Sequence, residues 1–138
     1  MEKEVHIIHS SVYASDPEKA ASNVAALIDG IAKPFFPLEG AWVCFLNDEN
    51  WKSGEFIEFY PMSKKLSNKS GNPVFLDNPE GVSGAGTHFN LSVPNHRAEL
   101  ELICQERNLV CAPRGWGNVL DIWIEEKLLI ECVFIDEV

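Results

Sequence analysis

Two histidines stand at matching places in the two halves of the chain. His9 precedes Asp16 by seven residues, and His88 precedes Asn95 by seven residues. Each histidine falls in a run of strand-forming residues, and the residue seven positions later suits the start of a helix. This repeat predicts that the chain folds as two copies of one strand-helix-strands unit.

A capping signal followed by an apolar stripe predicts the first helix, which comes after a strand at residues 4–13. Residues 15–18 combine a capping side chain, a proline suited to the first helical position and an acid in the first turn. Apolar side chains then recur at helical spacing, at Ala20, Val24, Leu27, Ile28 and Ile31. We expect this helix to end at Pro34 and Pro37, because proline cannot continue a helix.

The remaining strands are predicted from β-branched, aromatic and alternating residues between turn signals. They are residues 41–46, 55–60, 87–93, 119–124 and 128–135, with residues 74–76 as a possible short strand. A second helix begins near Asn95 and ends at Asn108, and residues 125–127 form a hairpin turn.

These elements predict one α+β domain over residues 1–138, made of two tandem βαβ(β)β units. The first unit covers about residues 4–62 and the second residues 87–138. Residues 63–86, rich in Ser, Asn, Gly, Lys and Pro, form the linker. We expect a curved mixed sheet with a concave cleft on one face and the helices on the outer face.

One acid lies between apolar residues in the closing strand of each predicted unit. These acids are Glu58 and Glu131. In the last strands, alternation places Asp121 and Trp123 on the face of Glu131 and leaves a uniformly apolar face for the helix. An ionised carboxylate among apolar neighbours is costly to bury unless it is paired, bound to a metal or open to solvent.

If the two units are related by an approximate twofold axis, four polar residues meet around it: His9, Glu58, His88 and Glu131. Two imidazoles and two carboxylates suit a divalent ion such as nickel, zinc, manganese or iron. Glu58 or Glu131 would then act as a base on a carbon next to a carbonyl. The alternative for each histidine is a hydrogen-bonded, half-buried side chain without a metal.

This pattern resembles the vicinal oxygen chelate superfamily, which includes glyoxalase I, extradiol dioxygenases and bleomycin resistance proteins. In that family each unit opens with a strand bearing a histidine and closes with a strand bearing a glutamate, as at His9 with Glu58 and His88 with Glu131. The family unit has three strands after its helix, whereas only two are evident after the first helix here. The resemblance implies a glyoxalase-like fold and a homodimer.

Three functions follow from this reading. The first is a metal-dependent lyase or isomerase acting on a small oxygenated molecule, with Asp121, Trp123 and Arg114 contacting the substrate. The second is a metal-free protein that binds or sequesters a small molecule, for which the net charge of −10 favours a cationic ligand. The third is a scaffold whose cleft is filled by side chains. A solvated loop is the alternative place for Arg114.

Composition excludes other classes of protein. The charge of −10 argues against a nucleic-acid partner, and no apolar run is long enough to span a membrane. The first residues lack the pattern of a signal peptide, so we expect a cytoplasmic protein. Four cysteines without a CxxC pair indicate buried thiols rather than disulfides or a zinc site.

Overall fold

The computed structural model describes residues 7–49, 51, 55–67, 74–81, 87–93, 95–114, 118–125 and 128–134. Its elements are, in chain order, β1 (His9–Ala14), α1 (Pro17–Ile28), β2 (Ile31–Pro34), β3 (Trp42–Phe45), β4 (Phe56–Pro61), β5 (Lys64–Ser67), β6 (Val74–Asp77), β7 (Thr87–Val93), α2 (Arg97–Arg107), β8 (Val110–Pro113), β9 (Val119–Glu125) and β10 (Leu128–Phe134).

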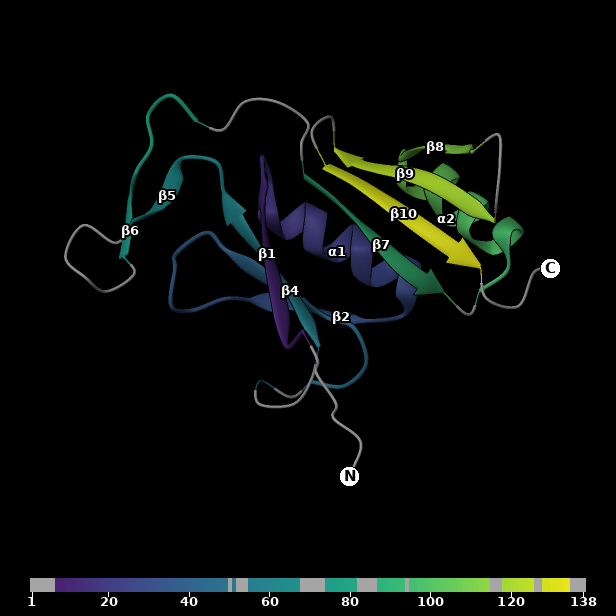
Figure 1. Ribbon diagram of the computed structural model, residues 1–138, viewed down its shortest axis with the longest axis horizontal. Coiled ribbons are helices and arrows are strands. Elements are labelled where there is room, and N and C mark those ends of the chain that lie inside the picture. Colours follow the sequence, from purple (N-terminus) through teal and green to yellow (C-terminus); the bar gives the residue numbers. More distant parts are fainter. Residues whose placement is uncertain are drawn as a thin grey trace.

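Unit 1 (β1 to β4 with α1) and unit 2 (β7 to β10 with α2) have the same topology (Figure 1). Their sheets have the orders β1-β4-β3-β2 and β7-β10-β9-β8, and the outer pair β1-β4 or β7-β10 is parallel in both. From the first strand to the end of the second, equivalent residues are 79 positions apart, as His9 is from His88 and Asp29 from Asn108. The predicted duplication and the α+β class are confirmed.

The expected single curved sheet is instead two four-stranded sheets and a separate two-stranded one. Among the described residues, β1 pairs only with β4 and β7 only with β10. In Figure 1 the two larger sheets stand side by side, with α1 between them and α2 behind β9 and β10, and the small β5-β6 sheet extends away from them. Part of the predicted linker is therefore a hairpin; residues 68–73 and 82–86 lie outside the described part.

The first helix ends earlier than its apolar stripe predicted. Asp29 adopts the left-handed conformation (φ 54°), and its N–H bonds the carbonyl of Ala25, which closes α1 after Ile28. Gly30 follows, and a Cβ there would lie only 2.5 Å from the carbonyl oxygen of Phe45. Only glycine permits this approach. Ile31 therefore opens β2, the strand that the sequence analysis missed.

The second helix shows the same ending. Asn108, the residue equivalent to Asp29, is also left-handed (φ 57°), and β8 begins two residues later. This helix starts at Arg97 with His96 as its N-cap, one residue later than Asn95 suggested. Each unit thus has the three strands after its helix that the family resemblance requires. Residues 126 and 127 of the predicted turn, and residues 4–6 of the predicted first strand, lie outside the described residues.

The main core lies on the helix-facing sides of both sheets and is continuous between the units. α1 packs on β2, β3 and β4 and also contacts β9 and α2. Ile57 and Phe59 of unit 1 and Ile130 and Cys132 of unit 2 all point into this core. No helix among the described residues is long and apolar enough to cross a membrane.

Two polar contacts join the units at α1. The carboxylate of Glu125 at the end of β9 accepts hydrogen bonds from the backbone N–H groups of Ser15 (2.5 Å) and Asp16 (3.3 Å). The Arg107 guanidinium at the end of α2 donates to Oδ1 of Asn23 at 3.0 Å. A carboxylate at a helix N-terminus is favourable, so Glu125 helps to hold the start of α1 against unit 2.

The four cysteines are free thiols, as expected from their spacing. Burial raises the pKa of Cys44, Cys104 and Cys132 to about 12. A thiol with so high a pKa holds its proton at neutral pH and is a poor nucleophile. These three cysteines are therefore poor candidates for catalysis.

Candidate functional site

Glu58 and Glu131 lie on the open face of their sheets, the face opposite the helix. Their neighbours along the strand point into the helix-side core, so alternation turns both carboxylates the other way. Both are nevertheless buried, with 5% and 9% of the residue exposed. The sequence analysis placed Glu131 on this face correctly, together with Asp121 and Trp123.

In unit 1 the Glu58 carboxylate is held by hydroxyl groups. Ser11, its partner across β1, donates to Oε2 at 2.6 Å, and Tyr60 donates to the same oxygen at 2.5 Å. Nε2 of His9 lies 3.6 Å from this oxygen. The predicted neighbourhood of His9 and Glu58 is thus present, whereas Ser11 and Tyr60 were not predicted as site residues. Both share the face of Glu58 by strand alternation, which could have identified them.

Aromatic rings surround this carboxylate. The His9 ring stacks on Phe56 with the ring centres 5.1 Å apart, and Phe35 contacts Tyr60 at 6.2 Å and Trp51 at 6.0 Å. Burial, with the hydrogen bond to Glu58 as a second cause, raises the pKa of Tyr60 to about 12. The phenol therefore keeps its proton at neutral pH and remains a donor to Glu58.

In unit 2 the Glu131 carboxylate is held by a guanidinium. Nη2 of Arg114 pairs with Oε2 of Glu131 and lies 2.5 Å from Oδ1 of Asp121, while Nε donates to Oδ2 of Asp121 at 3.2 Å. Oε1 of Glu131 accepts from the Asn90 amide at 3.1 Å and lies 3.9 Å from Nε2 of His88. Arg114, Asp121 and Glu131 were each predicted as site residues, but their mutual ion pairs were not.

These ion pairs shift the pKa of both partners in the expected directions. The hydrogen bond from Arg114 lowers the pKa of Glu131 below its usual 4.5, and the bond to Asp121, followed by that to Glu131, raises the pKa of Arg114. The guanidinium is therefore the fixed counter-ion of two carboxylates. This contact replaces the free, substrate-facing arginine considered from the sequence.

Backbone pairing shows which residues of the two units are equivalent. In the strand register Val43 of β3 lies opposite Glu58, and Asp121 of β9 lies opposite Glu131. Val43 is therefore the equivalent of Asp121. The N–H of Phe35 bonds the carbonyl of Ala41 at 2.9 Å, as that of Arg114 bonds Val119 at 3.1 Å. Phe35 thus occupies in unit 1 the place that Arg114 occupies in unit 2.

The four predicted metal ligands form two separate pairs, His9 with Glu58 and His88 with Glu131. In the described part of the chain, no three side chains of the types His, Cys, Asp and Glu lie close enough together to hold a metal ion. A bound cation at Glu131 would also have to displace the Arg114 guanidinium. The residues in this arrangement therefore do not fit a four-ligand metal centre.

A groove lies between the two units and is lined by residues of both. One part, of about 270 Å³, is lined by His9 and Phe56 of unit 1 and by Asn90 and Leu91 of unit 2. A second part, of about 420 Å³, shares Asn90 and Leu91 and extends to Ser92. Among the lining residues, His9 lies 3.6 Å from the Glu58 carboxylate and Asn90 donates a hydrogen bond to Glu131.

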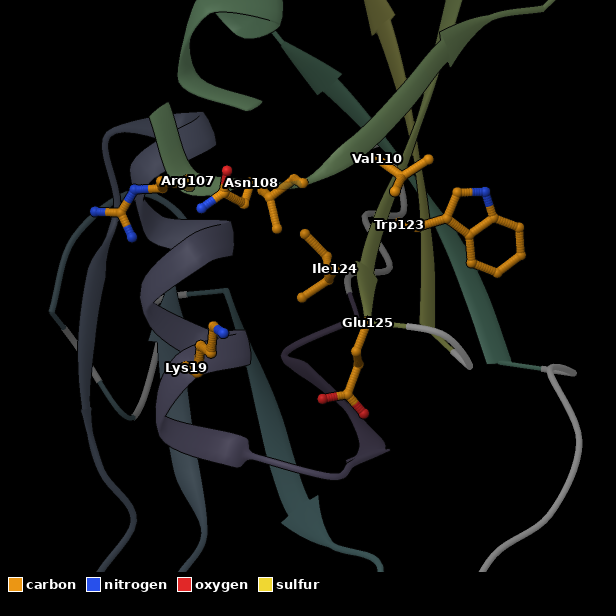
Figure 2. A pocket seen from close by; sticks show the side chains of 8 residues that line it. Lys19, Arg107, Asn108, Val110, Trp123, Ile124 and Glu125 are labelled. Atoms are coloured by element: carbon orange, nitrogen blue, oxygen red, sulfur yellow. The ribbon is translucent and has the colours of Figure 1, made fainter. Parts of the chain in front are cut away.

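Trp123 shares the face of Asp121 on β9, as strand alternation predicted. It lines a pocket of about 460 Å³ between α1 and β9, together with Lys19, Ile124 and Glu125. Figure 2 shows Lys19 and Ile124 around this pocket and the ring of Trp123 on the far side of β9 from Lys19. The ring is thus not part of the groove between the units.

No family model and no curated protein match the sequence. In structure, however, the chain is similar to several solved proteins over nearly its whole length. One is an integron cassette protein of V. cholerae, with a TM-score of 0.64 and 10% sequence identity over 99% of each chain. Another is the fosfomycin resistance protein FosX of Listeria monocytogenes, with a TM-score of 0.60 and 11% identity over 96% of this chain and 91% of that one. A third is a lactoylglutathione lyase of Agrobacterium tumefaciens, with a TM-score of 0.57 and 14% identity over 97% of this chain and 96% of that one. The chain has the fold of the vicinal oxygen chelate superfamily.

Proposed function

We propose that this glyoxalase-like protein binds a small organic molecule without a metal ion, in the groove between its two units. The observation that carries the proposal is the groove itself, because His9 and Asn90 line it and each contacts a buried glutamate. Its larger part, of about 420 Å³, is of the size that small-molecule sites have. Structural neighbours that include a resistance protein and a lyase are compatible with such a site.

Hydrogen bonds and an ion pair within the chain support binding without a metal. The hydroxyls of Ser11 and Tyr60 hold Glu58, and Arg114 holds Glu131. A buried carboxylate with such partners has no need of a metal ion for its stability.

Filling the groove with a large side chain tests the proposal. Ser92 lines the groove and is exposed, so Ser92→Trp should remove the thermal stabilisation that a bound small molecule gives to the wild type. Val110→Trp is the matched control, because Val110 is exposed and lines the pocket of Figure 2 instead. Ligands from a fragment library that stabilise both variants equally would contradict a site in the groove.

A metal-dependent lyase or isomerase is the second candidate, favoured by the two histidine-glutamate pairs. It requires the pairs to converge, for instance in a homodimer, which we also propose from the family resemblance. Metal analysis of protein purified without chelator, combined with light scattering, tests both points. Stoichiometric metal that is lost in His88→Ala would favour this candidate over metal-free binding.

A further inference from the structure

We propose that the open face of unit 1 binds an organic cation, with the Glu58 carboxylate pairing with a guanidinium, amidinium or ammonium group of the ligand. This ligand class rests on the proposed function, since it names what the groove and the adjoining open face would hold. The same molecule contains the template for such a contact, because unit 2 already holds a guanidinium on the equivalent glutamate.

Unit 2 shows how the shared framework binds a guanidinium. Arg114 follows β8 directly, and its side chain reaches the open face, where it contacts both Asp121 and Glu131. The paired contact with Asp121 through Nε and Nη2 is the geometry in which guanidinium and carboxylate bind most strongly. The backbone of this fold thus presents its glutamate to a planar cation.

Unit 1 repeats the framework without the cation. Phe35 stands in the place of Arg114 and Val43 in that of Asp121, while the glutamate is retained as Glu58. No lysine or arginine among the described residues pairs with Glu58. Pairing with a positive charge stabilises a carboxylate that is buried to this degree, and a cationic ligand would supply such a charge to Glu58.

One oxygen of Glu58 is left for such a partner. Ser11, Tyr60 and His9 all contact Oε2, and within the described part of the chain Oε1 accepts no hydrogen bond. In unit 2, by contrast, both oxygens of Glu131 are used, one by Asn90 and the other by Arg114. Glu58 therefore has a free acceptor where Glu131 has none.

The aromatic rings of unit 1 also suit a cation. Phe56 and Tyr60 flank Glu58 on its strand, and Phe35 packs on Tyr60 and Trp51. The faces of such rings attract guanidinium and ammonium groups. The net charge of −10 raises the local concentration of cations around the whole molecule.

Titration with benzamidinium, followed by calorimetry and NMR, tests the proposal. This probe carries a planar amidinium on an aromatic ring, and benzamide and benzoate are its neutral and anionic counterparts. We expect saturable binding of benzamidinium and at least about tenfold weaker binding of the other two, which corresponds to about 1.4 kcal/mol.

Two matched variants locate the site. Glu58→Gln removes the charge but keeps an oxygen that accepts from Ser11 and Tyr60, and it should weaken benzamidinium binding at least about tenfold. Glu131→Gln makes the same change in unit 2, where Arg114 already occupies the carboxylate, and should leave binding unchanged. Phe35→Leu should weaken binding less than Glu58→Gln, because it removes only one ring of the surroundings.

Three outcomes would overturn the proposal: no saturable binding of benzamidinium, equal binding of benzamide, or equal losses in Glu58→Gln and Glu131→Gln. Saturable binding of a divalent metal that excludes benzamidinium and is lost in Glu58→Gln would also overturn it. If benzamidinium fails while other ligands still stabilise the wild type but not Ser92→Trp, the ligand class is wrong and the proposed function stands. If both experiments fail, neither stands.

Discussion

Unit 1 and unit 2 place a buried glutamate at the same point of the same framework but surround it with different side chains. Around Glu131 the neighbours are ionic, with Arg114 bridging two carboxylates. Around Glu58 they are aromatic rings and two hydroxyls. The two units therefore share an apolar helix-side core and the position of the glutamate, whereas the side chains on their open faces differ in chemistry.

The largest effect is expected on the helix side, at the residue that follows each glutamate. Phe59 and Cys132 are equivalent and both fully buried. Phe59→Ala leaves a large cavity and should lower the free energy of unfolding by about 3–5 kcal/mol, whereas Cys132→Ala should cost about 1 kcal/mol. Urea unfolding of both variants measures this. Equal losses would mean that the volume removed at Phe59 does not determine the cost.

Removing the counter-ion of unit 2 should have the next largest effect. Arg114→Met leaves the carboxylates of Asp121 and Glu131 facing each other without a cation, so the thermal midpoint should fall by several degrees. Adding Glu131→Gln to this variant should recover part of the loss. Lys64→Met is the control, because its partner Asp77 is exposed and such a surface pair contributes little. A drop in Lys64→Met as large as in Arg114→Met would show that the cluster has no special role.

The ion pair also predicts a dependence on pH. The folded pKa of Glu131 lies below the ordinary 4.5, so the unfolded chain takes up a proton first on acidification. The stabilisation is complete above pH 4.5 and is lost as the pH falls through the lowered, folded pKa. Urea unfolding across this acidic range should give a shallower slope in Arg114→Met than in the wild type. An unchanged slope would disprove the contribution of this pair.

The smallest effect is expected at the helix ends, where both units have a left-handed residue that is not glycine. Asp29→Gly should stabilise the protein by up to about 1 kcal/mol, because glycine adopts this conformation without strain. Asn108→Gly should gain less, since asparagine tolerates the left-handed region better than most residues. Thermal unfolding of the pair checks the order, and a loss of stability in both would show that the caps depend on their side chains.

The sequence predicted the duplication because its signals are local. The seven-residue spacing from histidine to helix start, and the alternation around Glu58 and Glu131, need only short windows. β2 was missed because Ile31 continues the helical spacing of α1, and the ending at Asp29 and Gly30 depends on contact with Phe45. Because β2 and β8 were not predicted, Phe35 and Arg114, which follow these strands, could not be placed relative to the glutamates.

That omission explains what was missing from the candidate site. Once Arg114 is placed after β8, it reaches Asp121 and Glu131, and Phe35 takes the matching place in unit 1. The sequence identified the arginine and both acids separately but supplied no pairing between them. The distances that keep the two histidine-glutamate pairs apart depend on how the two sheets are packed, which short-range patterns do not encode.

The central claim is that the two units differ in the source of the cation, which is Arg114 in unit 2 and a ligand in unit 1. Calorimetry tests this claim most directly, by counting the benzamidinium sites in three proteins. We expect one site in the wild type, none in Phe35→Arg, which places a guanidinium beside Glu58, and a second site in Arg114→Met, which frees Glu131 and Asp121. The same number of sites in all three proteins would contradict the equivalence of the two glutamates.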